Sequence, residues 1–263
     1  MIVNMPKFRE KLKAGRVCLG SAISFTDPSA VEALCESVDF FWIDLEHTPI
    51  GFESLQAHLI AARAGGAPVL VRVPSNDIAW TKRVLDIGAE GLILPQAKSV
   101  KEIEDFVAAC RYPPRGKRGF GPRRSSNYGR VSLAKYLEHA NDNVFVSVQI
   151  ETAEALEALD AIVKIPGIDA LVVGPADLSG ALLGSPGQVS HPKILEKIGL
   201  ICSKAHQAGM SVGIGMGADM DYAVKVAQLG VNWIQCSGDC SFMLAGVDSL
   251  YKGIRERLAS GGR

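Results

Sequence analysis

The sequence lacks net charge, paired cysteines and long apolar runs, and each absence excludes a class of protein. Its 263 residues carry 28 basic and 28 acidic side chains, so no overall field attracts nucleic acid or an anionic membrane. The six cysteines form no CxxC pair and no zinc-finger spacing, which is typical of a protein in a reducing cytoplasm. No stretch reaches the roughly 18 apolar residues of a membrane span, and the N-terminal MIVNMPKFREKLKAG predicts a charged amphipathic helix, not a secretion signal. We therefore expect neither a nucleic-acid nor a membrane partner.

The sequence does contain a regular alternation of strand-like and helix-like patterns. Apolar runs typical of buried parallel strands occupy residues 17–23, 39–43, 68–73, 91–95, 144–150, 168–174, 211–215 and 233–238. A helix-like pattern follows each run, the last at about 241–258. These eight units predict a closed (β/α)8 TIM barrel, an α/β fold in which residues 1–263 form a single domain. The alternative is an open doubly wound sheet, but no run is followed by a GxGxxG loop that opens a helix.

Two acidic residues stand just past the ends of apolar runs, Glu151 after VFVSVQI and Asp177 after ALVVGPA. A carboxylate at the end of a buried strand is costly without a partner, so the two together predict a shared metal ion. Carboxylates without Cys or clustered His favour a hard cation such as Mg²⁺ or Mn²⁺. The alternative is that each acid only stabilises a helix start, Glu151 through the helix dipole and Asp177 as a cap.

A third apolar run, FFWI, is followed by Asp44, Glu46 and His47, and a fourth, PVLV, ends at Arg72. We expect Asp44 to hydrogen-bond His47 and orient it for proton transfer. A buried guanidinium at Arg72 needs an anion, which a substrate carboxylate would supply. The alternatives are a structural histidine and an arginine paired with a neighbouring acid. Because active sites of TIM barrels lie at the C-terminal ends of the strands, all these residues are expected in one pocket.

The segment from Tyr112 to about Asn143 interrupts the alternation, and its first half, YPPRGKRGFGPRRSSNYGR, is rich in Arg, Gly and Pro. Such a long loop is typical of a lid or a binding loop. Because it follows the fourth predicted strand, we expect it to lie over the site. The alternatives are a solvated flexible loop and an RNA contact, the latter disfavoured because no basic domain surrounds it.

A lysine mechanism is a further alternative, because an enzyme that forms a Schiff base needs a lysine buried at a strand end. Lys98, four residues after the LIL run, is the nearest candidate. We expect it to open a solvated helix, and we favour the metal mechanism.

The motifs IDLEH, VRV with Arg72, YPPRGKRGFG, VQIET and GPADLS occur in this order. As a set they resemble the HpcH/HpaI aldolase family, the class II pyruvate aldolases, from about residue 17 to 250. The resemblance implies a TIM barrel that binds Mg²⁺, Mn²⁺ or Co²⁺. It also implies a homo-oligomer, usually a hexamer built from dimers that exchange their last helix.

The resemblance further assigns roles to individual residues. It implies metal ligation by Glu151 and Asp177, His47 as the catalytic base with Asp44 as its partner, and Arg72 in contact with the keto oxygen of pyruvate. It implies substrate binding by Gln149 and by the stretch Gly174, Pro175, Ala176 and Asp177, with the backbone at Ala176 and Asp177 holding the pyruvate carboxylate.

The activity implied is retro-aldol cleavage of 4-hydroxy-2-oxo acids to pyruvate and an aldehyde, in the catabolism of aromatic compounds or sugar acids. The stretches GIGMGAD and SGDCS depart from the better-known aldolases, so the aldehyde stays open. One alternative is a CoA-ester lyase of the citrate lyase β-subunit type, in which the Arg-rich loop would serve the nucleotide. Another is a non-catalytic barrel that binds a small acid or a partner protein.

Overall fold

The structure, a computed structural model, describes residues 2–260, and within them eight parallel strands close into a barrel in the order β1 to β8. The strands are β1 Cys18–Ile23, β2 Phe40–Asp44, β3 Val69–Arg72, β4 Gly91–Leu94, β5 Phe145–Ile150, β6 Ala170–Val173, β7 Ser211–Met216 and β8 Trp233–Gly238. Strand β8 pairs with β1 and closes the sheet. The predicted single-domain TIM barrel is confirmed.

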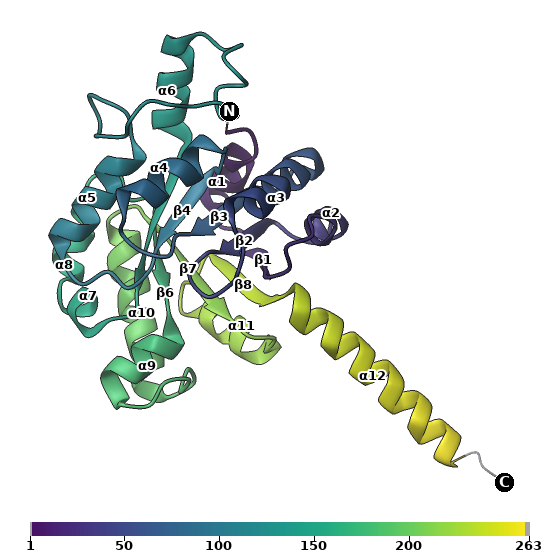
Figure 1. The fold of residues 1–263 in the computed structure, drawn as a ribbon. Coiled ribbons are helices and arrows are strands. Elements are labelled where there is room, and N and C mark those ends of the chain that lie inside the picture. Colours follow the sequence, from purple (N-terminus) through teal and green to yellow (C-terminus); the bar gives the residue numbers. More distant parts are fainter. Residues whose placement is uncertain (1, 261–263) are drawn as a thin grey trace.

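Helices follow the strands around the outside of the barrel (Figure 1). They are α1 Met5–Lys13, α2 Ser29–Leu34, α3 Phe52–Gly65, α4 Ile78–Asp86, α5 Val100–Cys110, α6 Leu133–Asn143, α7 Ala153–Glu157, α8 Leu159–Ile162, α9 Pro175–Leu183, α10 Pro192–Gln207, α11 Met220–Gln228 and α12 Asp239–Ser260. Polar side chains set several helix starts: the side chains of Asp77, Ser99 and Asp219 each accept a backbone N–H of the first turn of the following helix.

The core has two layers because parallel strands are apolar on both faces. All residues of β2 and β5 are buried. Outside the barrel, their side chains pack against the helices. Inside, α1 closes the N-terminal end of the barrel: the ring of Phe8 lies 5.4 Å from that of Phe40 and 5.8 Å from that of Phe145. Gly213 makes room in this interior, since a Cβ there would collide with the Trp233 ring.

The last helix, α12, leaves the barrel and extends away from it (Figure 1). It is longer at both ends than predicted. Along it, large apolar side chains are exposed: Phe242, Met243, Leu244, Val247, Leu250, Tyr251, Ile254 and Leu258. Leu19 on β1 is also exposed, at 52%. No helix within residues 2–260 is both long and apolar enough to cross a membrane.

The expectation that the Arg-rich segment lies over the site is wrong. The segment follows α5, which has already returned the chain to the N-terminal end of the barrel, and it leads to the start of β5. There Arg118 pairs with Asp86 at the end of α4 at 2.7 Å, and Arg124 donates to the carbonyl oxygens of Ile87 and Leu59. Both arginines are buried and hold the segment there, whereas most other residues between 113 and 135 are exposed to solvent.

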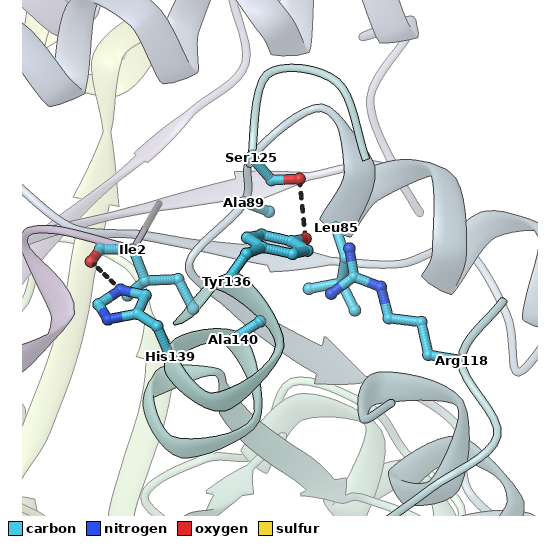
Figure 2. A pocket seen from close by; sticks show the side chains of 9 residues that line it. Ile2, Leu85, Ala89, Arg118, Ser125, Tyr136, His139 and Ala140 are labelled. Atoms are coloured by element: carbon cyan, nitrogen blue, oxygen red, sulfur yellow. Dashed lines mark hydrogen bonds between the residues drawn. The ribbon is translucent and has the colours of Figure 1, made fainter. Parts of the chain in front are cut away.

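The second half of that segment forms α6, which packs at the same end (Figure 2). The hydroxyl groups of Tyr136 and Ser125 are hydrogen-bonded at 3.0 Å. His139 Nε2 lies 2.7 Å from the carbonyl oxygen of Ile2. The cavity between these side chains is only about 10 Å³, about the room that one water molecule needs. We assign it no ligand.

Candidate active site

A cavity of about 230 Å³ opens at the C-terminal ends of the strands. Its lining comprises Ala22, Trp42, Asp44, His47, Arg72, Gln149, Val173, Gly174, Pro175, Ala176, Asp177, Gly215 and Gln235. Every predicted site residue is among them except Glu151, which is buried beside the cavity and bonded to Gln149. The structure therefore brings together side chains that lie more than 100 positions apart in sequence.

Asp44 and Arg72 form a bidentate ion pair. The register of β2 and β3 places the two residues directly opposite each other. Arg72 Nε donates to Asp44 Oδ1 at 2.9 Å and Arg72 Nη2 donates to Oδ2 at 2.6 Å. Burial lowers the pKa of Arg72, but the bonds to Asp44 and the nearby carboxylates outweigh it and raise the pKa overall. Arg72 is therefore a fixed cation that faces the cavity. A neighbouring acid holds it in place, which is the alternative that the sequence left open for Arg72.

His47 does not pair with Asp44 as expected, because Arg72 occupies both carboxylate oxygens. The imidazole Nε2 lies 3.5 Å from Glu46 Oε2 instead, and the His47 side chain is 63% exposed. The same carboxylate lies 3.2 Å from Arg72 Nη1. Burial raises the pKa of Glu46, opposed by the charges of Arg72 and His47.

Glu46 is thus a residue that the sequence analysis left without a role. A signal was present, since IDLEH places three ionisable groups within four residues at a strand end. The local pattern could not show which acid faces the histidine and which faces the arginine across the strands. That choice follows from the pairing of β2 with β3.

Glu151 lies directly after β5 and is 1% exposed. Its Oε1 accepts the backbone N–H of Gln96 at 2.7 Å and its Oε2 accepts Gln149 Nε2 at 2.5 Å. Gly174 is required beside it, because a Cβ there would collide with the carboxylate and the Gln149 amide. The pKa of Glu151 is raised to about 7, mainly by burial and in part by the negative charges of Asp177 and Glu46, while the hydrogen bond from the Gln96 N–H and the charge of Arg72 oppose the rise.

The first turn of α9 supplies backbone donors at the same cavity. Pro175 begins the helix after Gly174, and the N–H groups of Ala176 and Asp177 lie in the first turn, where no carbonyl four residues earlier accepts them. Exposed N–H groups at a helix N-terminus bind carboxylates and phosphates. This arrangement can hold a carboxylate next to the Asp177 side chain.

The acidic residues here fit a hard divalent cation. Within residues 2–260, no group of three or more His, Cys, Asp and Glu side chains is arranged to hold a metal ion. The pair Glu151 and Asp177 is too small for a closed structural site, but it leaves positions open for substrate oxygens. Burial is the main reason that the pKa of Glu151 is raised and the negative charge of Asp177 adds to it, and a bound cation would offset both effects.

Lys98 takes no part in the site. It is exposed just before α5, and its backbone N–H donates to the side chain of Glu102 at 3.0 Å. It does not line the cavity.

Comparisons with known proteins agree with this geometry. The family model described as HpcH/HpaI aldolase/citrate lyase matches residues 24–244. A hydroxypyruvate/pyruvate aldolase of Pseudomonas aeruginosa is 36% identical over 255 residues, which cover 95% of this chain and 90% of that protein. A 4-hydroxy-2-oxo-heptane-1,7-dioate aldolase of Salmonella dublin is 35% identical over 246 residues, 92% of each chain. The crystal structure of an HpcH/HpaI aldolase from Desulfitobacterium hafniense superposes with a TM-score of 0.88 at 32% identity, covering 94% of this chain and 96% of that one.

Proposed function

This chain belongs to the HpcH/HpaI aldolase/citrate lyase family, and on that premise we propose that it is a divalent-metal-dependent aldolase of 4-hydroxy-2-oxo acids. Its relatives support a lyase activity in general. The finer assignment rests on one observation: a fixed cation, a histidine and the Asp177 carboxylate line one cavity at the C-terminal ends of the strands, and Glu151 is buried beside it.

The substrate binds with its carboxylate at the first turn of α9, near the N–H groups of Ala176 and Asp177. Glu151 and Asp177 would hold Mg²⁺, Mn²⁺ or Co²⁺. When bound, the ion supplies Lewis-acid stabilisation of negative charge on the 2-oxo oxygen. Arg72 donates to the same oxygen, for which its pairing with Asp44 orients it. Gln149 limits the cavity and fixes the Glu151 carboxylate.

Cleavage then needs one proton transfer. His47, which reaches the cavity from its open side, accepts the proton of the 4-hydroxyl group. The C3–C4 bond breaks, C4 becomes the carbonyl carbon of the aldehyde, and the electron pair forms the enolate of pyruvate. Return of the proton to C3 gives pyruvate. Glu46, 3.5 Å from the His47 Nε2, stabilises the protonated imidazole in place of the expected Asp44.

The two alternative functions have less support. A CoA-ester lyase would use the Arg-rich segment to bind its nucleotide, but that segment lies at the opposite end of the barrel from the cavity. A non-catalytic acid-binding barrel would need neither a histidine at the cavity nor two carboxylates close enough to raise a pKa.

We propose that the chain forms a homo-oligomer through α12, by exchange of this helix between two copies. Eight large apolar side chains are exposed along the helix, and Leu19 on β1 is exposed on the barrel. Exposed apolar surface of this extent is typical of an interface. From the family resemblance we further propose that the homo-oligomer is a hexamer.

The proposed setting is catabolic. We propose a cytoplasmic location because all six thiols are free. Cleavage of a 4-hydroxy-2-oxo acid fits the breakdown of aromatic compounds or sugar acids. We propose no partner among nucleic acids or membranes.

The test is pyruvate release from 4-hydroxy-2-oxo acids, followed by a coupled dehydrogenase assay with and without EDTA. We expect EDTA to abolish release and added Mg²⁺ or Mn²⁺ to restore it. Glu151→Ala and Asp177→Ala should each lose metal binding by calorimetry with an unchanged circular dichroism spectrum. Glu157→Ala, an exposed acid on α7, is the matched control. Activity that withstands EDTA but is lost on borohydride treatment with substrate would replace this mechanism by one through a lysine.

A further inference from the structure

A second cavity, of about 340 Å³, adjoins the first at the C-terminal ends of β7, β8 and β1. The two cavities share Ala22 and Gln235 in their walls. The acidic pair lies on the side of β5 and β6, so the second cavity extends away from the proposed metal site. Its volume suits a small molecule.

The wall of the second cavity offers no positive charge. Among the described residues that line it there is no Lys, Arg or His, and Asp239 is its only carboxylate. That carboxylate is already occupied: it accepts Ser24 Oγ at 2.6 Å, Phe25 N at 2.9 Å and Cys240 N at 2.8 Å, and both of its oxygens accept Ser24 N. It adds negative charge without a free lone pair for a substrate. A substrate carboxylate placed here would lose hydration and meet no cation.

Ser237 is the unusual residue in this wall. It has φ of 65°, in the left-handed region that side chains other than Gly rarely adopt. The irregular register between β1 and β8 lies next to it, and Gln235 Nε2 donates to its carbonyl oxygen at 2.5 Å. The residue lines the cavity and is 6% exposed, and its hydroxyl makes no hydrogen bond to any residue between 2 and 260. A glycine would fit this backbone at less cost, and a strained residue of this kind points to a function.

We propose that the second cavity is the subsite for the aldehyde, and that it selects small, neutral, hydroxylated aldehydes over aldehydes with a terminal carboxylate. The Ser237 hydroxyl pairs with a hydroxyl group of the aldehyde. The uncharged wall and the occupied Asp239 exclude an anionic end. This inference rests on the proposed aldolase function, because it concerns the second product of the same cleavage.

Two measurements on the wild-type protein distinguish a failure of the proposed aldehyde subsite from a failure of the proposed aldolase function. Exchange of the methyl protons of pyruvate in D₂O, with Mg²⁺ present, reports enolate formation without an aldehyde. The kcat/KM for aldol addition of pyruvate is then compared for glycolaldehyde, its near-isostere propanal, and succinic semialdehyde. We expect exchange, a preference for glycolaldehyde over propanal, and at least a roughly tenfold preference for glycolaldehyde over succinic semialdehyde. Absence of exchange would overturn the aldolase function and this inference with it. Exchange together with equal or better use of succinic semialdehyde would overturn the inference alone.

Variants test the wall directly. Ser237→Ala and Ser237→Gly should each lower the preference for glycolaldehyde over propanal by roughly fivefold, the value of about one hydrogen bond. The glycine variant suits the left-handed backbone, so it separates loss of the hydroxyl from strain. Ala218→Arg places a cation at the exposed rim and should raise kcat/KM for succinic semialdehyde. A glycolaldehyde preference that is unchanged in both Ser237 variants would show that this hydroxyl does not bind the acceptor.

Discussion

The affinity of the site for a divalent cation should rise with pH, because a proton and the cation compete for Glu151. Without metal, burial raises the pKa of this carboxyl group to about 7. Metal ligation requires the ionised form. With this pKa, roughly a tenth of the carboxyl groups are ionised at pH 6 and roughly nine tenths at pH 8, so the apparent affinity should rise about tenfold between them. Calorimetric titration with Mn²⁺ at pH 6, 7 and 8 measures this directly.

The same shift predicts how stability depends on pH. A carboxyl group whose pKa is raised from 4.5 to about 7 favours the folded state when protonated, so its contribution is complete below pH 4.5 and is lost as the pH rises through 7. A cation should therefore raise the melting temperature more at pH 8 than at pH 6. Glu151→Gln should bind Mn²⁺ weakly and with little pH dependence. A wild-type affinity that is constant from pH 6 to 8 would refute the argument.

Three further predictions follow from the ion pair, the interior and the last helix. Asp44→Asn should lower kcat/KM roughly 10- to 100-fold because Arg72 is no longer held in place. In steady-state kinetics, the double variant Asp44→Asn/Arg72→Gln should lose little more activity than Arg72→Gln alone. Additive losses would mean that the two residues act separately. Phe8→Ala should lower the free energy of unfolding, measured with urea, by about 3–5 kcal/mol, because the ring is buried against Phe40 and Phe145. Phe120 is exposed, so Phe120→Ala should lower it by less than about 0.5 kcal/mol. Lysine at both Leu250 and Ile254 should convert the assembly to monomers in light scattering after gel filtration, and an unchanged mass would remove α12 from the interface.

The convergence of the site could be predicted from sequence because of how parallel strands are connected. Each strand of a βα barrel must run in the same direction, so residues just past the ends of apolar runs share one end of the barrel. Glu151, Asp177, Arg72 and His47 all follow this rule and lie at or beside one cavity. The roles of these residues in catalysis stay predictions until variants are measured.

The partner of each charged group could not be predicted in the same way. Asp44 has a local candidate in His47 and a distant one in Arg72, and sequence spacing favours the local one. The register of β2 against β3 places Arg72 directly opposite, where its planar guanidinium fits both carboxylate oxygens. Glu46 is then left facing the histidine.

By itself, the sequence determined the barrel, the strands that end in ionisable residues and the end of the barrel where these residues lie, because all three depend on local periodicity and on chain direction. Only the tertiary structure decided what depends on contacts between distant elements. It paired Asp44 with Arg72, sent the Arg-rich segment to the opposite end because α5 reverses the chain, and extended α12 away from the barrel. It also opened the second cavity beside Ser237, whose left-handed backbone no sequence pattern announces. The register of two strands, the reversal of the chain by a helix and the strain of a backbone conformation all depend on how elements pack together. The sequence pattern of a single strand or helix therefore does not predict them.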